Sequence, residues 1–321
     1  MKILLALMVF GLLSCDDEGT SFHWEGTPGT PVYFDLGSLT PEISVTMNST
    51  PATESFVLDT GSPINLADVG SYSEAPGLYS KDVTALGLTF PGLPVVFEDW
   101  IHDSAPVSGI LGASVLIHFN WEIDYPNQLL TLYDTDFPQD LSSDTPVSFM
   151  LKGGGRYRAS NGDILDVGAT RHLVWLEIEG ERVLALLDTG ASYMVMAQSF
   201  FNLLGGMEGR ADLGTQEMFT VNGVVQAQLT NLSEMNFEDA PIQSELTNIA
   251  TAIMPDAFFS ELQVETGKVV EILLGGSYLS HFRLRFATDD RIIWASPPTL
   301  KKSSLTPSGR LRMPPVLETV P

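Results

Sequence analysis

The sequence FVLDTGS occupies residues 56–62 and returns as ALLDTGA at residues 185–191. In both copies a run of apolar residues, typical of a buried strand, leads directly into Asp-Thr-Gly. Glycine allows the sharp backbone turn that presents the preceding aspartate at the end of a strand. The repeat therefore predicts two equivalent strand-to-turn units that each present one carboxyl group, that of Asp59 and that of Asp188.

A second repeated segment follows each copy of the first. Residues 110–119 (ILGASVLIHF) match residues 273–282 (LLGGSYLSHF) in register at Leu, Gly, Ser, Leu, His and Phe. The spacing from the Asp of the first motif to the Gly of the second is 53 residues in the first copy and 87 in the second. Self-similarity of this kind indicates a duplicated structural unit. We expect two related halves, of which the second is the longer.

The composition favours short strands and turns over long helices. The 321 residues include 28 glycines and 20 prolines, and 44% of them are hydrophobic, enough for real cores. The formal charge of −24 repels phosphate, which excludes nucleic acid as a partner. We predict an all-β fold of two related halves, and we expect a monomer.

Two aspartates on related turns can perform general acid–base chemistry. Pseudo-twofold packing of the halves would bring Asp59 and Asp188 together at the axis. Two carboxyl groups that lie so close cannot both ionise, so they share a proton. The ionised group can then take a proton from water while the other donates to a carbonyl oxygen. This chemistry would attack an amide without a covalent intermediate.

These motifs resemble those of the aspartic peptidases. The paired arrangement resembles the two-lobed pepsin type, whereas each half is similar to the retropepsin-like proteases of bacteria, above all in residues 109–133 (GILGASVLIHFNWEIDYPNQLLTLY). The resemblance covers roughly residues 32–134 and 170–295. It implies an all-β fold of two pseudo-twofold-related, β-barrel-like lobes with short helices. It also implies that Asp59 and Asp188 are the catalytic dyad of an aspartic endopeptidase that needs neither a metal nor an organic cofactor. The substrate would be an extended peptide or protein, gripped through its backbone between the lobes.

The resemblance also implies roles for the residues that follow each aspartate. Thr60 and Thr189 would hold the two loops together by mutual hydrogen bonds. Gly61 and Gly190 would allow the substrate backbone to approach closely.

The two motifs differ in the residue after the glycine. Ser62 gives the first motif the pepsin-like form DTGS, and Ala191 gives the second the retroviral form DTGA. We expect the Ser62 hydroxyl to reach the outer oxygen of Asp59, where a donor favours the ionised carboxylate. Asp188 would then carry the shared proton.

A lid over the cleft is expected from the second half. Asn222 and Gly223 lie between the runs MFTV and VVQA, and Asn-Gly between such runs is a strong signal for a tight β-hairpin. A hairpin here could fold back over Asp188 as a flap, but a surface hairpin that faces away from the site remains an alternative. In the first half, Tyr72 and Tyr79 do not lie in a comparable hairpin, so a packing role is favoured for both.

The amino terminus resembles a bacterial lipoprotein signal. A basic start is followed by an apolar run over residues 3–13, which is too short to span a bilayer. The end of this run and the next two residues read Leu12-Leu13-Ser14-Cys15. Residues 1–15 are therefore interpreted as a signal peptide with a lipidated Cys15, and residues 16–30 as a flexible acidic tether. We expect an exported protein, lipid-anchored on the periplasmic or cell-surface side of a bacterial membrane. An ordinary secretory peptide with an incidental cysteine is the alternative.

The remaining boundaries follow from the repeats. The first lobe is predicted for residues 31–134, an inter-lobe connection for 135–169, the second lobe for 170–295 and a disordered Pro-rich tail for 296–321. Two other functions stay open. The chain could be a non-catalytic lipoprotein that binds peptides or proteins in the same cleft, or a protease that processes only itself.

Overall fold

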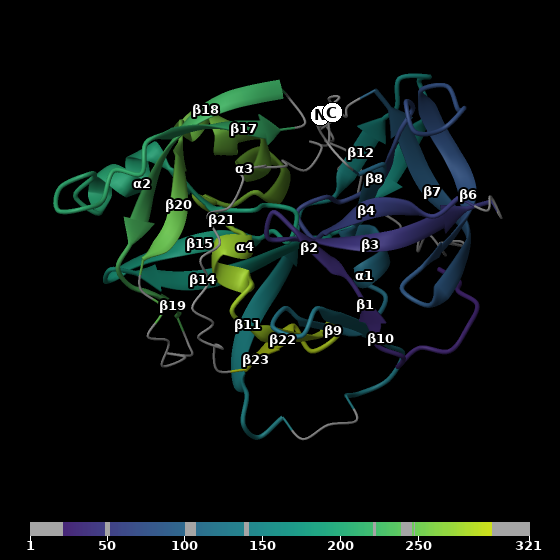
Figure 1. Ribbon diagram of the computed structural model, residues 1–321, viewed down its shortest axis with the longest axis horizontal. Helices are drawn as coiled ribbons and strands as arrows, with labels where there is room; N and C mark the ends of the chain where they lie inside the picture. The colour runs from purple at the N-terminus through teal and green to yellow at the C-terminus, as the bar shows by residue number, and fades with distance from the viewer. Residues whose placement is uncertain are drawn as a thin grey trace, which may run out of the picture.

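The computed structural model describes residues 22–48, 52–99, 107–137, 141–220, 223–238, 246 and 248–296. In these residues the chain consists mostly of β-strands, and it forms two lobes above a shared sheet (Figure 1). The helices are only four to seven residues long, and none that the structure describes is long and apolar enough to cross a membrane. The predicted all-β fold of two lobes is confirmed.

The first lobe is a seven-stranded sheet that closes on itself. Its strands run in the order β2-β3-β4-β8-β5-β7-β6, and β3 also pairs with β6. The strands are β2 (Asp35–Gly37), β3 (Thr40–Met47), β4 (Glu54–Asp59), β5 (Asn65–Asp68), β6 (Gly77–Ala85), β7 (Leu88–Glu98) and β8 (Gly109–Gly112), and the short helix α1 (Ala113–Leu116) follows β8.

The second lobe repeats this design with added elements. Its strands run in the order β14-β15-β21-β16-β20-β18-β17, and β19 pairs with β14. The strands are β14 (Arg171–Ile178), β15 (Glu181–Leu187), β16 (Met194–Ala197), β17 (Thr215–Thr220), β18 (Gly223–Leu232), β19 (Met235–Phe237), β20 (Ile249–Met254) and β21 (Ile272–Leu274). The helices are α2 (Gln198–Leu203), the 3-10 helix η1 (Asp256–Phe259), α3 (Ser260–Thr266) and α4 (Gly276–Leu279).

A six-stranded sheet joins the lobes from below, as Figure 1 is drawn. Its order is β1-β10-β9-β22-β23-β11, and β11 continues into the second lobe by pairing with β14. Its strands are β1 (Val32–Tyr33), β9 (Asn120–Asp124), β10 (Leu129–Tyr133), β11 (Thr145–Lys152), β22 (Arg283–Ala287) and β23 (Ile292–Ala295). The predicted boundaries at residues 134 and 170 therefore cut through this sheet, because both lobes and the connection contribute strands to it.

The strand pairing shows the duplication directly. In the first lobe β8 pairs in parallel with β4 and antiparallel with β5, and in the second lobe β21 pairs in the same two ways with β15 and β16. In the first lobe Asp59 lies opposite Gly112. In the second lobe Leu187 lies opposite Leu274, and these two residues directly precede Asp188 and Gly275, the equivalents of Asp59 and Gly112. The two repeated segments of each half are therefore neighbouring strands.

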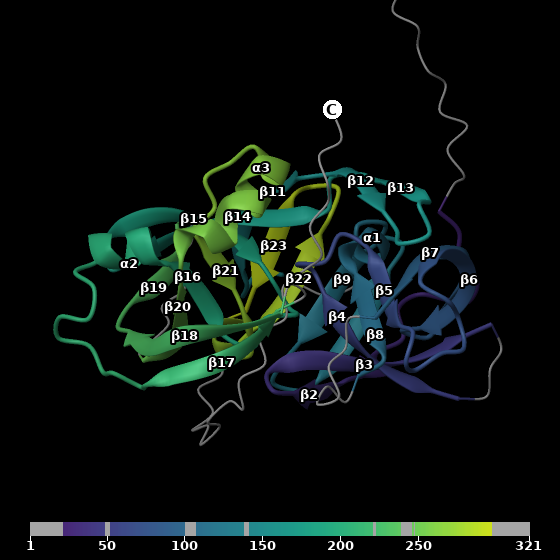
Figure 2. The same cartoon turned by 90° about the horizontal axis from the view of Figure 1, so that it is seen from above.

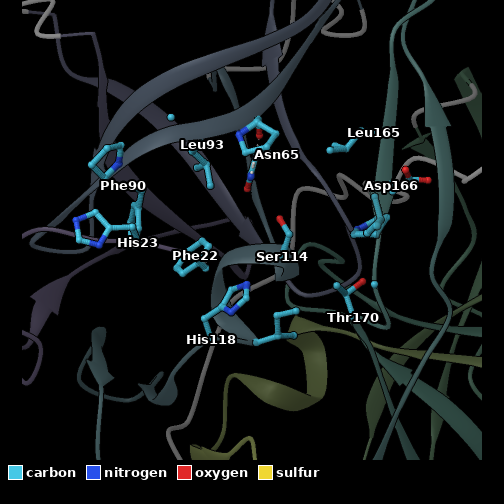
Figure 3. A pocket seen from close by; sticks show the side chains of 17 residues that line it. Phe22, His23, Asn65, Phe90, Leu93, Ser114, His118, Leu165, Asp166 and Thr170 are labelled. Atoms are coloured by element: carbon cyan, nitrogen blue, oxygen red, sulfur yellow. Dashed lines mark hydrogen bonds between the residues drawn. The ribbon is translucent and has the colours of Figure 1, made fainter. Parts of the chain in front are cut away.

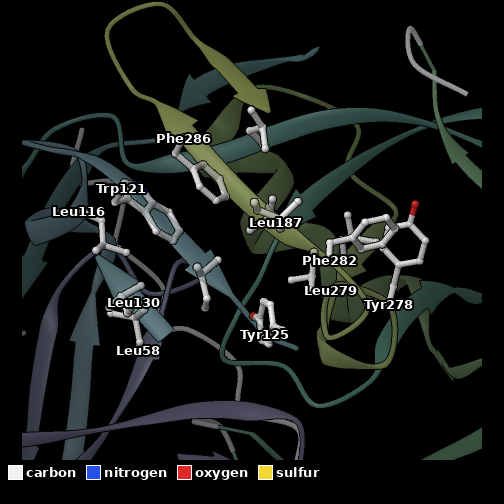
Figure 4. Packing of buried hydrophobic residues seen from close by; sticks show 14 of the residues in the cluster. Leu58, Leu116, Trp121, Tyr125, Leu130, Leu187, Tyr278, Leu279, Phe282 and Phe286 are labelled. Atoms are coloured by element: carbon white, nitrogen blue, oxygen red, sulfur yellow. The ribbon is translucent and has the colours of Figure 1, made fainter. Parts of the chain in front are cut away.

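One hydrophobic core supports both aspartate-bearing strands. Leu58 and Leu187, each directly before an aspartate, are fully buried in the same cluster as Trp121 and Phe286 of the shared sheet. The rings of Trp121 and Phe286 stack at 3.8 Å with an interplanar angle of 3° (Figure 4). Because packing this close resists movement, the core fixes the relative position of the two strand ends.

The chain is already packed against the first lobe from Phe22 on. The Phe22 ring stacks on His118 at 3.9 Å, Trp24 packs against Phe119 at 4.9 Å, and Glu25 forms a β-bridge with Thr89. The prediction of a flexible tether is therefore wrong for residues 22–30. Its first part, residues 16–21, lies outside the described residues.

Candidate active site

Asp59 and Asp188 lie at the ends of two equivalent strands. Asp59 is the last residue of β4, Asp188 directly follows β15, and both residues are fully buried. In each loop two backbone N–H groups donate to Oδ1 of the aspartate. The donors are Gly61 N (2.7 Å) and Ser62 N (3.1 Å) for Asp59, and Gly190 N (3.0 Å) and Ala191 N (3.1 Å) for Asp188.

Thr60 and Thr189 join the two loops by reciprocal hydrogen bonds. The Thr60 N–H donates to Thr189 Oγ1 and the Thr189 N–H to Thr60 Oγ1, both at 3.0 Å. The hydroxyls in turn donate across the lobes, Thr60 to the Leu187 carbonyl (2.8 Å) and Thr189 to the Leu58 carbonyl (2.7 Å). The mutual bonds that the resemblance implies are present, and they hold the two aspartates in register.

Gly61 and Gly190 each lie against the carboxyl group of the opposite lobe. A Cβ on Gly61 would lie 2.5–2.7 Å from the carboxyl atoms of Asp188, and one on Gly190 would lie 2.3–2.6 Å from those of Asp59. Each glycine therefore makes room for the carboxyl group of the opposite lobe. The close approach of a substrate backbone to these glycines stays a prediction.

The two carboxyl groups interact directly and titrate as a pair. Burial raises the pKa of Asp188 well above its usual value. The negative charge of Asp59 and hydrogen bonding with Asp59 raise the pKa of Asp188 further. Burial also raises the pKa of Asp59, but the hydrogen bond from Asp188 opposes that rise. The Oδ2 atoms of both carboxyl groups are buried and have no hydrogen-bond partner among the described residues. The site therefore retains one proton to a higher pH than a single aspartate would.

The expected role of the Ser62 hydroxyl is wrong. It donates to the carbonyl oxygen of Ile64 at 2.7 Å, within its own turn, and Ser62 contacts Asp59 only through its backbone N–H. The hydroxyl at this position therefore does not explain which aspartate carries the proton. Burial raises the pKa of both aspartates, and the asymmetry comes from their effect on each other, because Asp59 raises the pKa of Asp188 further whereas Asp188 lowers that of Asp59.

A buried ion pair beside the dyad was not predicted from the sequence. Arg171 and Glu265 have side chains that are each 1% exposed, and they form two hydrogen bonds, Nε to Oε1 at 2.8 Å and Nη2 to Oε2 at 2.7 Å. Burial raises the pKa of both aspartates, and the positive charge of Arg171 acts against that rise. The only hint in the sequence is an arginine at the start of a largely apolar strand, RHLVWLEI.

The predicted hairpin of the second half is present, but its turn is displaced by one residue. Strands β17 and β18 pair antiparallel, with Thr220 opposite Gly223, so Gly223 belongs to a strand rather than to the turn. Asn222 lies outside the described residues. In Figures 1 and 2 the end of the hairpin where the two strands meet points toward the middle of the molecule. The Tyr193 hydroxyl, from the segment after Asp188, donates to Gln216 Oε1 on β17 at 3.1 Å.

Tyr72 and Tyr79 belong to the packing of the first lobe. Both rings meet Phe97 edge to face, at 5.6 Å and 5.3 Å between centroids. Among the described residues, no group of three or more His, Cys, Asp or Glu side chains is placed to hold a metal ion.

Comparison with known proteins agrees with this architecture. Residues 174–281 match the family described as gag-polyprotein putative aspartyl protease. The structure is similar to that of an aspartic proteinase from Irpex lacteus, with a TM-score of 0.52 and 12% identity over 86% of this chain and 99% of that one. Basic 7S globulin from soybean has a TM-score of 0.47 and 11% identity, over 87% of this chain and 95% of that one. No curated protein matches in sequence. The chain has the two-lobed fold of pepsin-like aspartic proteinases.

Proposed function

We propose that the protein is an aspartic endopeptidase whose catalytic residues are Asp59 and Asp188. The observation that carries the proposal is the pairing of two fully buried carboxyl groups, each seated against the glycine of the opposite loop. Isolated buried carboxyl groups are costly, and a structure that places two of them together with raised pKa values is typical of a catalytic site.

The chemistry needs only water and this pair. Ionised Asp59 takes a proton from a water molecule, whose oxygen attacks the carbonyl carbon of the peptide bond while protonated Asp188 donates to the carbonyl oxygen. In the tetrahedral intermediate, Asp59 returns its proton to the peptide nitrogen, the C–N bond breaks, and Asp188 recovers a proton from a hydroxyl group of the new carboxyl. The cycle restores one proton on the pair.

The test is cleavage of a mixed peptide library by the full-length protein in detergent, with products identified by mass spectrometry at several pH values. We expect internal cleavage that fails as the pH rises above the raised pKa values and the pair loses its proton. Peptides that bind without being cut would support the non-catalytic alternative. Cleavage of the chain's own segments alone would support self-processing.

We also propose that the β17–β18 hairpin is the lid of this site. Its support is the Tyr193–Gln216 hydrogen bond, which ties the hairpin to the segment after Asp188. Lids exclude water and complete the grip on the substrate. Gln216→Ala is therefore expected to lower kcat/KM several-fold without changing the melting temperature. The matched control is Gln226→Ala on β18, which removes an exposed bond to Glu217. Equal kcat/KM in both variants would contradict a lid.

We further propose that Cys15 carries the lipid anchor, although residues 1–21 lie outside the described residues. Since the chain is packed on the first lobe from Phe22, the span from Cys15 to Phe22 is at most about 25 Å even when fully extended. The first lobe would thus stay close to the bilayer.

The anchor is tested by fractionation. Wild-type protein should partition into detergent and carry diacylglycerol on Cys15, whereas Cys15→Ser should lose both the lipid and normal signal cleavage. Firm attachment is expected because a lipoprotein terminus carries more than one acyl chain. A soluble mature protein that begins at another residue would contradict the proposal.

A further inference from the structure

Arg171 lies beside the dyad because of the way in which β14 pairs with β15. The register of these strands places Leu173 opposite Leu186, and the same register, continued for two residues, brings Arg171 opposite Asp188. Opposite residues of an antiparallel pair have their side chains on the same face of the sheet. Burial raises the pKa of Asp59 and of Asp188, and the positive charge of Arg171 partly lowers it again.

The equivalent position of the first lobe carries no charge. The register of β3 and β4, continued in the same way, brings Thr40 opposite Asp59. Thr40 begins β3 as Arg171 begins β14, and the Thr40 hydroxyl donates to the carbonyl oxygen of Gly37 at 2.6 Å. The repeated frame therefore places a neutral side chain opposite one aspartate and a full positive charge opposite the other.

The guanidinium of Arg171 is buried and held by one carboxylate. The side chains of Arg171 and Glu265 are each 1% exposed, and two hydrogen bonds join them. Gly153, directly after β11, covers the pair, because a Cβ there would lie 2.7 Å from Glu265 Oε1 and 2.8 Å from Arg171 Cγ. Solvent screens a buried charge much less than an exposed one, so Arg171 acts strongly on its neighbours.

The chain beyond Gly153 leads away from this ion pair to the first lobe. Strands β12 (Gly155–Arg158) and β13 (Ile164–Val167) form a hairpin, which packs on the first lobe in a cluster that includes Ile64, Leu66, Leu165 and Val167. A cavity of about 470 Å³ lies between the hairpin and the first lobe (Figure 3). Thr170 lines this cavity and Arg171 does not, so the cavity does not expose the ion pair.

Other ionisable side chains around the dyad do not supply a positive charge beside it. Tyr125 is fully buried, and burial and the charge of Asp188 both raise its pKa, so it stays neutral. His172 follows Arg171 on β14 and therefore points to the other face of the sheet, and burial lowers its pKa to about 3. Lys152 lies one strand further from Asp188, on β11. Within the described residues, this leaves the Arg171 ion pair as the charged partner of the dyad.

We propose that Arg171 is the buried counter-ion of the dyad: its charge stabilises the single negative charge that Asp59 and Asp188 share, and Glu265 fixes the guanidinium and limits its effect. A carboxylate buried without compensation is costly, so the nearby cation lets the pair ionise once inside the protein. Arg171 is thus a positioning residue that acts through the two aspartates. The inference rests on the proposed peptidase function, because it concerns how the same pair is kept with one proton and one charge.

Two variants are expected to shift the pH profile of cleavage in opposite directions. The alkaline limb of kcat/KM reports the pKa at which the free enzyme loses the shared proton. Glu265→Gln leaves the charge of Arg171 unbalanced, so this limb should move to lower pH by about half a unit or more. Arg171→Met combined with Glu265→Gln removes the cation without leaving an unpaired buried charge, so the limb should move to higher pH by a similar amount.

The matched control is an ion pair at the far end of the same two strands. Glu179 lies in the turn between β14 and β15, and its carboxylate binds Arg210, with both side chains largely buried. Glu179→Gln should leave the alkaline limb where it is in wild type, and so should Arg171→Lys, which keeps the positive charge. A merely structural role predicts no shift in any variant. No shift, or shifts of the same sign in Glu265→Gln and the double variant, would overturn the inference.

A second measurement does not depend on cleavage. In protein labelled with ¹³C at the aspartate carboxyl groups, NMR follows the proton of the dyad, whose signals are those missing from Asp59→Asn and Asp188→Asn. If wild type cuts no peptide, the proposed function fails, but the pH of proton loss should still fall in Glu265→Gln and rise in the double variant. The same titration in all three proteins would overturn the counter-ion. If one variant does not fold, the sign of the shift in the other decides, and Arg171→Gln with Glu265→Gln, whose amides can bond to each other, replaces the double variant.

Discussion

Replacing either Asp59 or Asp188 by asparagine is expected to lower kcat/KM for peptide cleavage by about a hundredfold or more. General acid–base catalysis contributes about 10²–10⁴ in rate, and the proposed mechanism uses one carboxyl as base and the other as acid. Asparagine keeps the oxygen that accepts the backbone N–H bonds of each loop but cannot exchange a proton. The measurement is steady-state cleavage of a library-derived peptide by each variant. Near wild-type rates in either variant would contradict the assignment.

The folding control for these variants has a defined sign. Because the pKa of Asp188 is raised, the native state keeps a proton that the unfolded chain loses above about pH 3.8, so wild-type stability falls as the pH rises from there toward the native-state pKa. Asp188→Asn has no proton to lose at this position. Chemical denaturation should therefore show that the variant gains stability relative to wild type between pH 4 and pH 7. A loss over that range would mean that the raised pKa is wrong.

Arg285→Met is expected to lower the free energy of unfolding by about 3–5 kcal/mol, because it removes the cation shared by two buried carboxylates and leaves Asp144 only the more distant Arg283, at 3.9 Å. Arg285 lies on β22 of the shared sheet, opposite Glu122 of β9, and its guanidinium binds both Glu122 and Asp144. The side chains of these three residues are 2%, 10% and 1% exposed, respectively. The shared sheet carries both lobes, so its loss would also separate the two aspartates.

The matched control is an arginine whose ion pair is exposed. Arg156 binds Asp166 at 2.9 Å on the β12–β13 hairpin, with side chains 57% and 76% exposed. Exposed pairs contribute about 0–1 kcal/mol, so Arg156→Met should change the free energy of unfolding by no more than that. Denaturation by urea measures both variants. Equal losses of unfolding free energy in Arg285→Met and Arg156→Met would show that burial does not determine how much the ion pairs of Arg285 stabilise the protein.

The sequence determined the features that depend on neighbouring residues. The apolar run before each Asp-Thr-Gly and the second repeated segment predicted the duplication, the strand-to-turn units and the all-β, two-lobed fold. They also identified Asp59 and Asp188, since a carboxyl at the end of a buried strand is set by local pattern and turn chemistry. The Asn-Gly signal predicted the existence of a hairpin correctly and its turn position incorrectly by one residue, because the pairing register depends on both strands.

Only the tertiary structure decided which groups meet across the lobes. The packing of each glycine against the opposite aspartate and the docking of residues 155–167 on the first lobe depend on how the shared sheet sets the lobes against each other. The Arg171–Glu265 pair forms within the second lobe between residues far apart in the chain, and the Ser62 hydroxyl contact depends on a rotamer within its own turn. Such contacts join residues that are far apart in the chain or differ by a single rotamer. A periodic pattern records which face of a strand is buried, but it carries no information about the partner that covers it.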